Sequence, residues 1–156
     1  MDYTIIRDTR EKTGWNFDPF GNCLGMECRV LKTGDYSIKG FEDLVAIERK
    51  RNVEEIATNI GKKSVQFEAE MKRMTTIPHS YILCEFNLQE LLSFPATSTL
   101  SRQQRAQIRI TGKFILKRLL EYQMNYNVKI LFCGDAYGAY NVACSIFKRV
   151  VERMNG

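Results

Sequence analysis

Three side chains in the first third of the sequence, Asp35, Glu48 and Lys50, have the chemistry to bind a divalent cation and act on a phosphate. Glu48 and Lys50 belong to an apolar run typical of a β-strand, where alternate side chains share a face, so Arg49 between them points the opposite way. A hairpin through Gly40 can bring Asp35 beside Glu48. Carboxylates ligate Mg²⁺, which neutralises phosphate charge and acidifies a bound water, and Lys50 can orient or deprotonate that water and stabilise an oxyanion. The same spacing also fits a solvated strand end with a surface Glu–Lys pair.

The elements that must position these residues follow from hydrophobic periodicity and turn signals. The predicted strands cover residues 3–7, 26–31, 35–39, 43–50, 80–86 and 128–133. The predicted helices cover residues 53–60, 64–74, 88–93, 101–126 and 143–154. Ser101 and Gln104 match a capping box at the start of the fourth helix, and Gly112 within it allows two helices instead. This order predicts a mixed α/β domain with helices flanking one sheet.

Composition places the chain among globular domains. Its 156 residues are 44% hydrophobic and 26% charged, which fits one ordinary domain over residues 1–156. No apolar run is long enough to span a membrane, and the N-terminus lacks the order of a signal peptide. We therefore expect a soluble protein that is not secreted, in the cytoplasm of a bacterial or phage-infected cell, or in the nucleus of a eukaryotic one.

The cysteine count and the net charge add two expectations. The five cysteines, at positions 23, 28, 84, 133 and 144, fit no zinc template, so we expect a reducing compartment and free thiols at Cys23 and Cys28. The single histidine, His79, excludes catalysis that needs two. The formal charge of +5 favours an anionic partner, of which nucleic acid is the commonest, although it also fits simple solubility.

Four ordered motifs carry a resemblance to a known family. Gly34-Asp35 followed by Val45-Ala46-Ile47-Glu48-Arg49-Lys50 resembles the GD…VERK signature of the XPF-type structure-specific endonucleases, the excision-repair nuclease domain. The segment Ile6–Glu11 resembles the opening D-x-R-E of the family, and Arg73 with Tyr81–Phe86 resembles an arginine followed by a buried strand ending in Glu-Phe. Residues 128–154 resemble the closing strand and helix. The resemblance implies a restriction-endonuclease-like α/β fold and a Mg²⁺-dependent DNA endonuclease acting in repair, recombination or replication, for which Mn²⁺ can substitute.

The resemblance also implies roles for individual acids and bases. The expected metal ligands are Asp35, Glu48 and Asp8, the last only if the chain bends after strand one. The catalytic set expected from it is Asp8, Glu11, Asp35, Glu48, Arg49, Lys50 and Glu54. Glu11 is expected to hold a bridging water and Arg49 to orient a neighbouring acid or a phosphate. Glu54 stands where the family has aspartate, one methylene shorter. The alternatives are a catalytically silent DNA-binding or dimerisation subunit, and a junction-resolvase or restriction-type nuclease.

Basic residues predict a path for DNA, the expected partner. Near the site the candidates are Arg10, Lys12, Arg51, Lys62, Lys63 and Arg73. Farther along, basic residues recur at spacings of three or four, namely Arg102, Arg105, Arg109, Lys113 and Lys117. This spacing predicts one basic helix face, which could either follow a DNA backbone or, equally, only be exposed to solvent. We expect a single nuclease domain without the helix-hairpin-helix module that larger relatives append. The apolar last helix, and pairing within the family, lead us to expect a homodimer through the C-terminal part.

Overall fold

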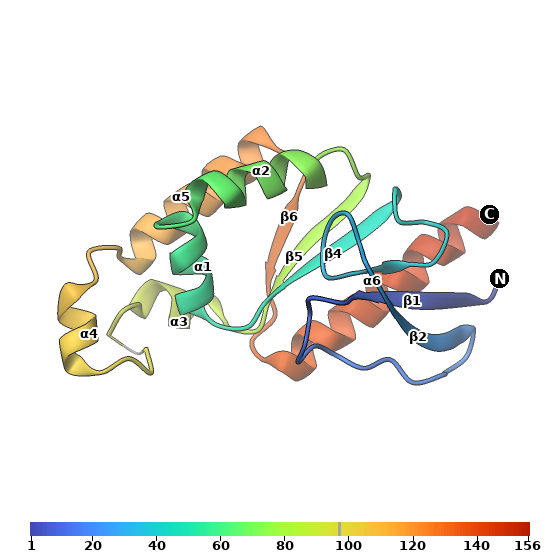
Figure 1. Cartoon of the computed structure of the whole chain (residues 1–156), viewed down its shortest axis with the longest axis horizontal. Coiled ribbons are helices and arrows are strands. Elements are labelled where there is room, and N and C mark those ends of the chain that lie inside the picture. The colour runs from blue at the N-terminus through green and yellow to red at the C-terminus, as the bar shows by residue number, and fades with distance from the viewer. Residues whose placement is uncertain (97) are drawn as a thin grey trace.

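One mixed sheet forms the centre of the computed structural model, which describes residues 1–96 and 98–156 (Figure 1). The strands lie in the order β2-β1-β3-β4-β5-β6. They are β1 (Tyr3–Asp8), β2 (Cys23–Arg29), β3 (Tyr36–Ile38), β4 (Val45–Lys50), β5 (His79–Cys84) and β6 (Lys129–Phe132). Strand β3 runs antiparallel to β1 and β4, whereas the pairs β1–β2, β4–β5 and β5–β6 are parallel. Strand β4 therefore lies inside the sheet, hydrogen-bonded on both sides.

Helices cover both faces of this sheet (Figure 1). They are α1 (Val53–Ile60), α2 (Ser64–Met74), α3 (Leu88–Ser93), α4 (Arg102–Gln107), α5 (Gly112–Asn125) and α6 (Ala136–Asn155). Helices α1, α2, α3 and α5 form one core with β5 and β6, and this core includes Phe67 and Ile82. Helix α6 packs on the other face, where its Phe147 joins Trp15 and Ile47. The fold is the restriction-endonuclease-like sheet with flanking helices that the sequence predicted.

The segment after α3 follows the two-helix alternative. Helix α4 ends at Gln107, the chain is extended at Ile108, and α5 begins at Gly112 behind its N-cap Thr111. A Cβ at Gly112 would lie 1.8 Å from the carbonyl oxygen of Leu91, so only glycine permits this close approach of α5 to α3. One continuous basic face from Arg102 to Lys117 was therefore a wrong prediction, because the extended link carries Arg109 between the two helices.

Candidate active site

A hairpin between β3 and β4 places Asp35 opposite the end of β4. The backbone N–H of Asp35 donates to the carbonyl of Ile47 at 2.8 Å, and its side-chain Oδ2 accepts from the backbone N–H of Arg49 at 2.8 Å. Gly34 makes the approach possible, because it has a φ of +78° and a Cβ there would lie 3.1 Å from the carbonyl oxygen of Ile47. Asp35 and Glu48 consequently line the same cavity, of about 530 Å³.

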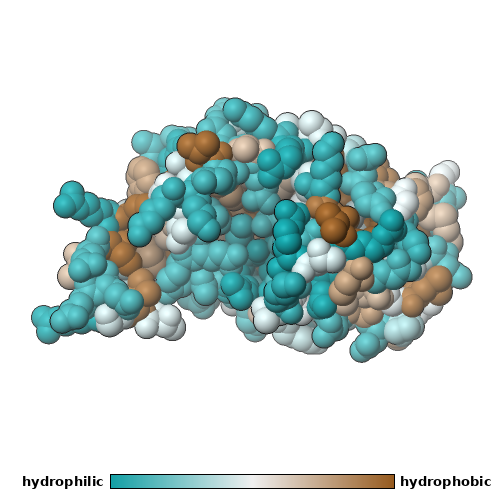
Figure 2. Space-filling model, in the orientation of Figure 1, coloured by the Kyte–Doolittle hydropathy of each residue, from teal (hydrophilic) through white to brown (hydrophobic). Residues whose placement is uncertain are grey.

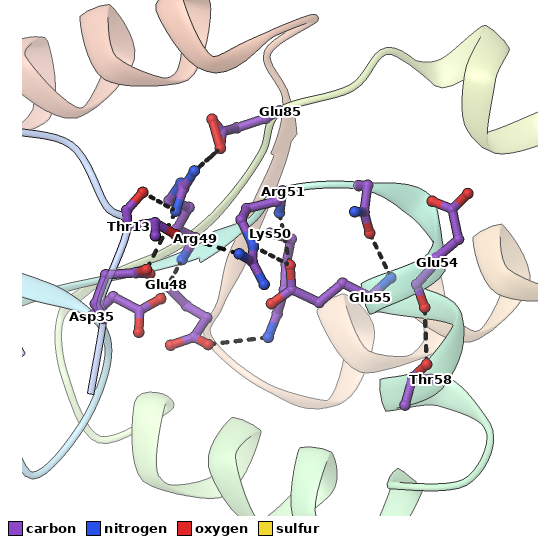
Figure 3. A network of polar contacts seen from close by, with 12 residues as sticks. Thr13, Asp35, Glu48, Arg49, Lys50, Arg51, Glu54, Glu55, Thr58 and Glu85 are labelled. Carbon is purple, nitrogen blue, oxygen red and sulfur yellow. Dashed lines mark hydrogen bonds and ion pairs between the residues drawn. The ribbon is translucent and has the colours of Figure 1, made fainter. Parts of the chain in front are cut away.

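Glu48 and Lys50 lie on one face of β4, as strand alternation predicted. The Lys50 Nζ donates to Glu48 Oε1 at 3.0 Å (Figure 3). The ammonium also lies over the ring of Phe67 on α2, 5.7 Å from the ring centroid. The Lys50 side chain is only 4% exposed. Burial by itself lowers the pKa of Lys50, but the combined attraction of Glu48, Glu70 and Glu55 outweighs it, so the pKa is raised and the lysine is an ammonium.

Asp8 and Glu11 reach the cavity through a turn, because β1 ends at Asp8 and the N–H of Glu11 donates back to its carbonyl. The Asp8 carboxylate accepts from the backbone N–H groups of Arg10 and Leu31 and from the Arg10 guanidinium. Burial opposes ionisation of Asp8, but these hydrogen bonds hold its pKa below the usual value. Asp8 thus fixes the loop that follows β1, and its oxygens are engaged with the protein itself.

Arg49 points to the opposite face of β4 and joins two acids. Its guanidinium lies 2.6 Å from Glu85 Oε1 and 3.3 Å from Glu11 Oε1, and it also donates to the carbonyl of Thr13 at 3.2 Å. It lies over the ring of Trp15, 5.7 Å from the centroid. Arg49 is 9% exposed, so this network is buried and positions Glu11 at the rim of the cavity.

Glu54 lies outside the cavity, whereas its neighbour Glu55 lies in its wall. Both belong to the first turn of α1, but successive residues of a helix point about 100° apart. Glu54 Oε1 accepts from the backbone N–H of Thr99 at 3.3 Å, and Glu55 Oε2 accepts from that of Arg51 at 2.9 Å. Figure 3 shows Glu54 turned away from Asp35 and Glu48.

Besides Glu55, the structure adds a second acid that the sequence analysis missed. Glu70 on α2 lines the cavity and its carboxyl group contacts that of Glu48. The available signal was its place on the helix, three residues after Phe67 and four before Met74, both of which are buried. An acid beside the apolar stripe of a helix has to face a polar site, because a buried carboxylate needs partners.

Several carboxyl groups are crowded together in this cavity. Burial, followed by repulsion from Glu48, raises the pKa of Asp35 to about 9. The same two causes raise the pKa of Glu70 to about 8. A divalent cation between Asp35 and Glu48 would relieve this repulsion, so the residues present fit a metal. Over residues 1–96 and 98–156 no three Asp, Glu, His or Cys side chains form a cluster that could hold a metal ion.

Basic side chains surround these acids. Of the predicted DNA-binding residues, Arg10, Lys12, Arg51 and Arg73 line the cavity, and Lys32 joins them. Lys62 and Lys63 are exposed in the turn between α1 and α2, outside the cavity. Arg102 and Arg105 lie on α4, none of whose residues is buried. Figure 2 shows hydrophilic side chains across the hollowed middle of this face.

The comparisons with known proteins agree with this architecture. The ERCC4 domain model matches residues 7–146. The solved structure of XPF from Aeropyrum pernix superimposes with a TM-score of 0.65 at 16% identity, over 94% of this chain and 61% of that one. The structure of XPF from Aeropyrum pernix in complex with DNA superimposes with a TM-score of 0.62 at 15% identity, over 97% of this chain and 66% of that one. No curated protein matches this chain in sequence.

The chain thus spans less than two thirds of these XPF chains. Within the described residues no helix is both long and apolar enough for a bilayer. Because the family model covers most of the chain, and Gly34, Asp35, Glu48 and Lys50 fall within the matched residues, the chain belongs to the ERCC4 domain family of XPF-type nucleases.

Proposed function

We propose that this chain is a metal-dependent DNA endonuclease that hydrolyses phosphodiester bonds. The observation that carries the proposal is the convergence of Asp35 and Glu48 on one cavity, together with the ion pair between Glu48 and the buried Lys50 behind it. Two carboxylates and an ammonium provide what the hydrolysis of a phosphate diester requires: a place for a cation, and a positive group for the charge that develops on the phosphate.

Asp35 and Glu48 would hold Mg²⁺ or Mn²⁺, with the carbonyl of Arg49 as a third oxygen. The bound ion would neutralise phosphate charge and acidify a water. Lys50 is an ammonium whose pKa is raised, so we assign it to charge stabilisation and orientation of the water rather than to proton abstraction. Asp8 holds the loop after β1 in place through hydrogen bonds, and Arg49 holds the Glu11 and Glu85 side chains through ion pairs. We therefore assign both residues to positioning.

Branched or flapped DNA is the substrate class we propose, in repair, recombination or replication. The support is the ERCC4 domain match and the similarity to an XPF structure solved with DNA. Arg10, Lys12, Lys32, Arg51 and Arg73 ring the acids and would contact backbone phosphates on either side of the cut.

We further propose a homodimer through the C-terminal part. Between β5 and α6 lies a groove of about 540 Å³, lined by residues that include Tyr81, Val142 and Ile146. The neighbouring Leu131 on β6 and Met154 on α6 are 40% and 42% exposed. Val142→Arg should convert a dimer into a monomer in sedimentation equilibrium. A wild-type monomer at all concentrations would contradict the dimer.

The decisive experiment maps cleavage of flap, fork, four-way and linear DNA with Mg²⁺ or Mn²⁺, using Asp35→Asn as the inactive control. Cuts near a flap or fork that depend on Asp35 support the proposal. Preference for four-way or linear DNA would instead favour a junction-resolvase or restriction-type nuclease. Binding without cleavage by the wild type would favour a silent DNA-binding or dimerisation subunit.

A further inference from the structure

If a cation binds in this cavity, Glu48 cannot fully serve both as a metal ligand and as the hydrogen-bond acceptor of Lys50. The only hydrogen bond of the Lys50 ammonium within the described part of the chain is the one to Glu48 Oε1. The same carboxylate is a proposed metal ligand. A divalent cation bound to Glu48 would compete with Lys50 for the carboxylate oxygens of Glu48, and it would repel the Lys50 ammonium. Because the Lys50 side chain is only 4% exposed, few water molecules could replace the lost hydrogen bond.

Glu70 is the second acidic residue beside Lys50. After Glu48, it contributes the largest attraction on the ammonium, ahead of Glu55. Its own charged neighbours are Glu48, Lys50 and then Arg73. Arg73 follows Glu70 by one helical turn and is exposed, so its attraction is screened more strongly than that of the buried Lys50.

Helix α2 presents Glu70 together with Phe67. The two residues are three apart and therefore neighbours on one helix face. The ring of Phe67 lies under the Lys50 ammonium, and the carboxyl group of Glu70 lies against that of Glu48. Helix α2 therefore offers the ammonium a second binding position, formed by the Phe67 ring and the Glu70 carboxyl group, and Glu70 also lines the cavity that holds Asp35.

We propose that Glu70 is a positioning residue, which keeps the Lys50 ammonium beside the reacting phosphate when a divalent cation occupies Glu48. The inference rests on the proposed function and deepens it. It distinguishes Glu70 from the ligands Asp35 and Glu48, because Glu70 acts through Lys50. Its removal should lower the rate of the chemical step while metal binding remains.

The first test is a double-mutant cycle in single-turnover cleavage. Glu70→Gln should slow cleavage by about 10- to 100-fold in an otherwise wild-type chain, the usual cost of losing a group that orients a metal site. In a Lys50→Met background it should add no further loss. Glu70→Asp should retain more activity than Glu70→Gln, because it keeps the charge. The matched control is Glu68→Gln on the same helix, whose hydrogen bond with Tyr126 lies outside the cavity. Wild-type activity in Glu70→Gln, or additive losses in the cycle, would overturn the proposal.

The second test needs neither DNA nor turnover. In protein labelled at lysine ¹³Cε, the Lys50 signal should keep an ordered, buried position when Mg²⁺ is added to the wild type or to Glu68→Gln. In Glu70→Gln, Mg²⁺ should shift it toward that of exposed lysines. Calorimetry should show Mg²⁺ affinity reduced far less in Glu70→Gln than in Asp35→Asn; an equal reduction would make Glu70 a ligand and overturn the proposal. A wild type that cleaves no DNA would refute the proposed function, and the Lys50 signal would still decide the role of Glu70.

Discussion

The Asp35 carboxylate accepts a 2.8 Å hydrogen bond from the backbone N–H of Arg49, which fastens the β3 side of the hairpin to the strand carrying Glu48. An asparagine at position 35 can accept the same hydrogen bond through its side-chain oxygen. Charge at this position can thus be removed with little effect on the fold.

Asp35→Asn and Glu48→Gln should each abolish cleavage while DNA binding stays equal or becomes tighter. Both substitutions weaken the cation site and reduce the repulsion of phosphates, and the lost stabilisation should cost at least ~10³-fold in rate. Single-turnover cleavage and a fluorescence binding assay measure the two effects. Cleavage at the wild-type rate with Mg²⁺ in both variants would rule out this active site.

Arg49→Ala should destabilise the fold. It leaves Glu85, whose side chain is 4% exposed, without its cation, and breaking a buried ion pair from one side costs about 3–5 kcal/mol. Urea unfolding followed by circular dichroism gives the change in the free energy of unfolding. Arg51→Ala is the matched control, because Arg51 is 55% exposed and pairs only loosely with Glu55, so its loss should cost under about 1 kcal/mol.

Glu54→Gln and Glu55→Gln should differ. Glu54 faces the segment at Thr99 outside the cavity, so cleavage should be nearly unchanged. Glu55 lines the cavity and caps the N–H of Arg51, so its substitution should slow cleavage several-fold. Parallel rate measurements decide between them, and a large loss in Glu54→Gln alone would restore the role that family resemblance gave to this position.

Replacing Arg102, Arg105 and Arg109 together with alanine should weaken DNA binding without changing the rate at saturating DNA. If all three contact phosphates of duplex DNA, the slope of log K against log salt should fall by about 0.9 for each contact. Binding titrations between low and high salt give the slope. Lys148→Ala on α6 is the control, and an unchanged slope in the triple variant would identify a merely solvated face.

The five cysteines should react with iodoacetamide in the order of their exposure, since all are free thiols. Cys28 is exposed, so mass spectrometry should find it alkylated first. Cys84 is buried, and burial raises the pKa of its thiol to about 12. It should remain unmodified in the folded protein even at pH 9, because almost no thiolate forms there, and become labelled only in denaturant. Rapid labelling of Cys84 under native conditions would contradict its placement in the core.

Local pattern was enough to predict most of the elements and the face shared by Glu48 and Lys50. The turn signal at Gly40 and the alternation along β4 are encoded within a few residues, so Asp35 could be placed opposite Glu48 without a tertiary structure. Glu70 could not, because its role depends on how α2 packs across β4. The engagement of Asp8 likewise depends on Leu31, which is distant in sequence.

The position of β4 inside the sheet limits how often the backbone of the site opens to solvent. Its neighbours β3 and β5 both hydrogen-bond to it, and all six of its residues are buried, so its amide hydrogens should exchange with solvent slowly. The backbone that carries Glu48 and Lys50 is therefore among the slowest parts of the molecule to open. If the chain binds branched DNA as proposed, we expect adaptation to the shape of the DNA to come from surface elements such as α4, whose six residues are all outside the core.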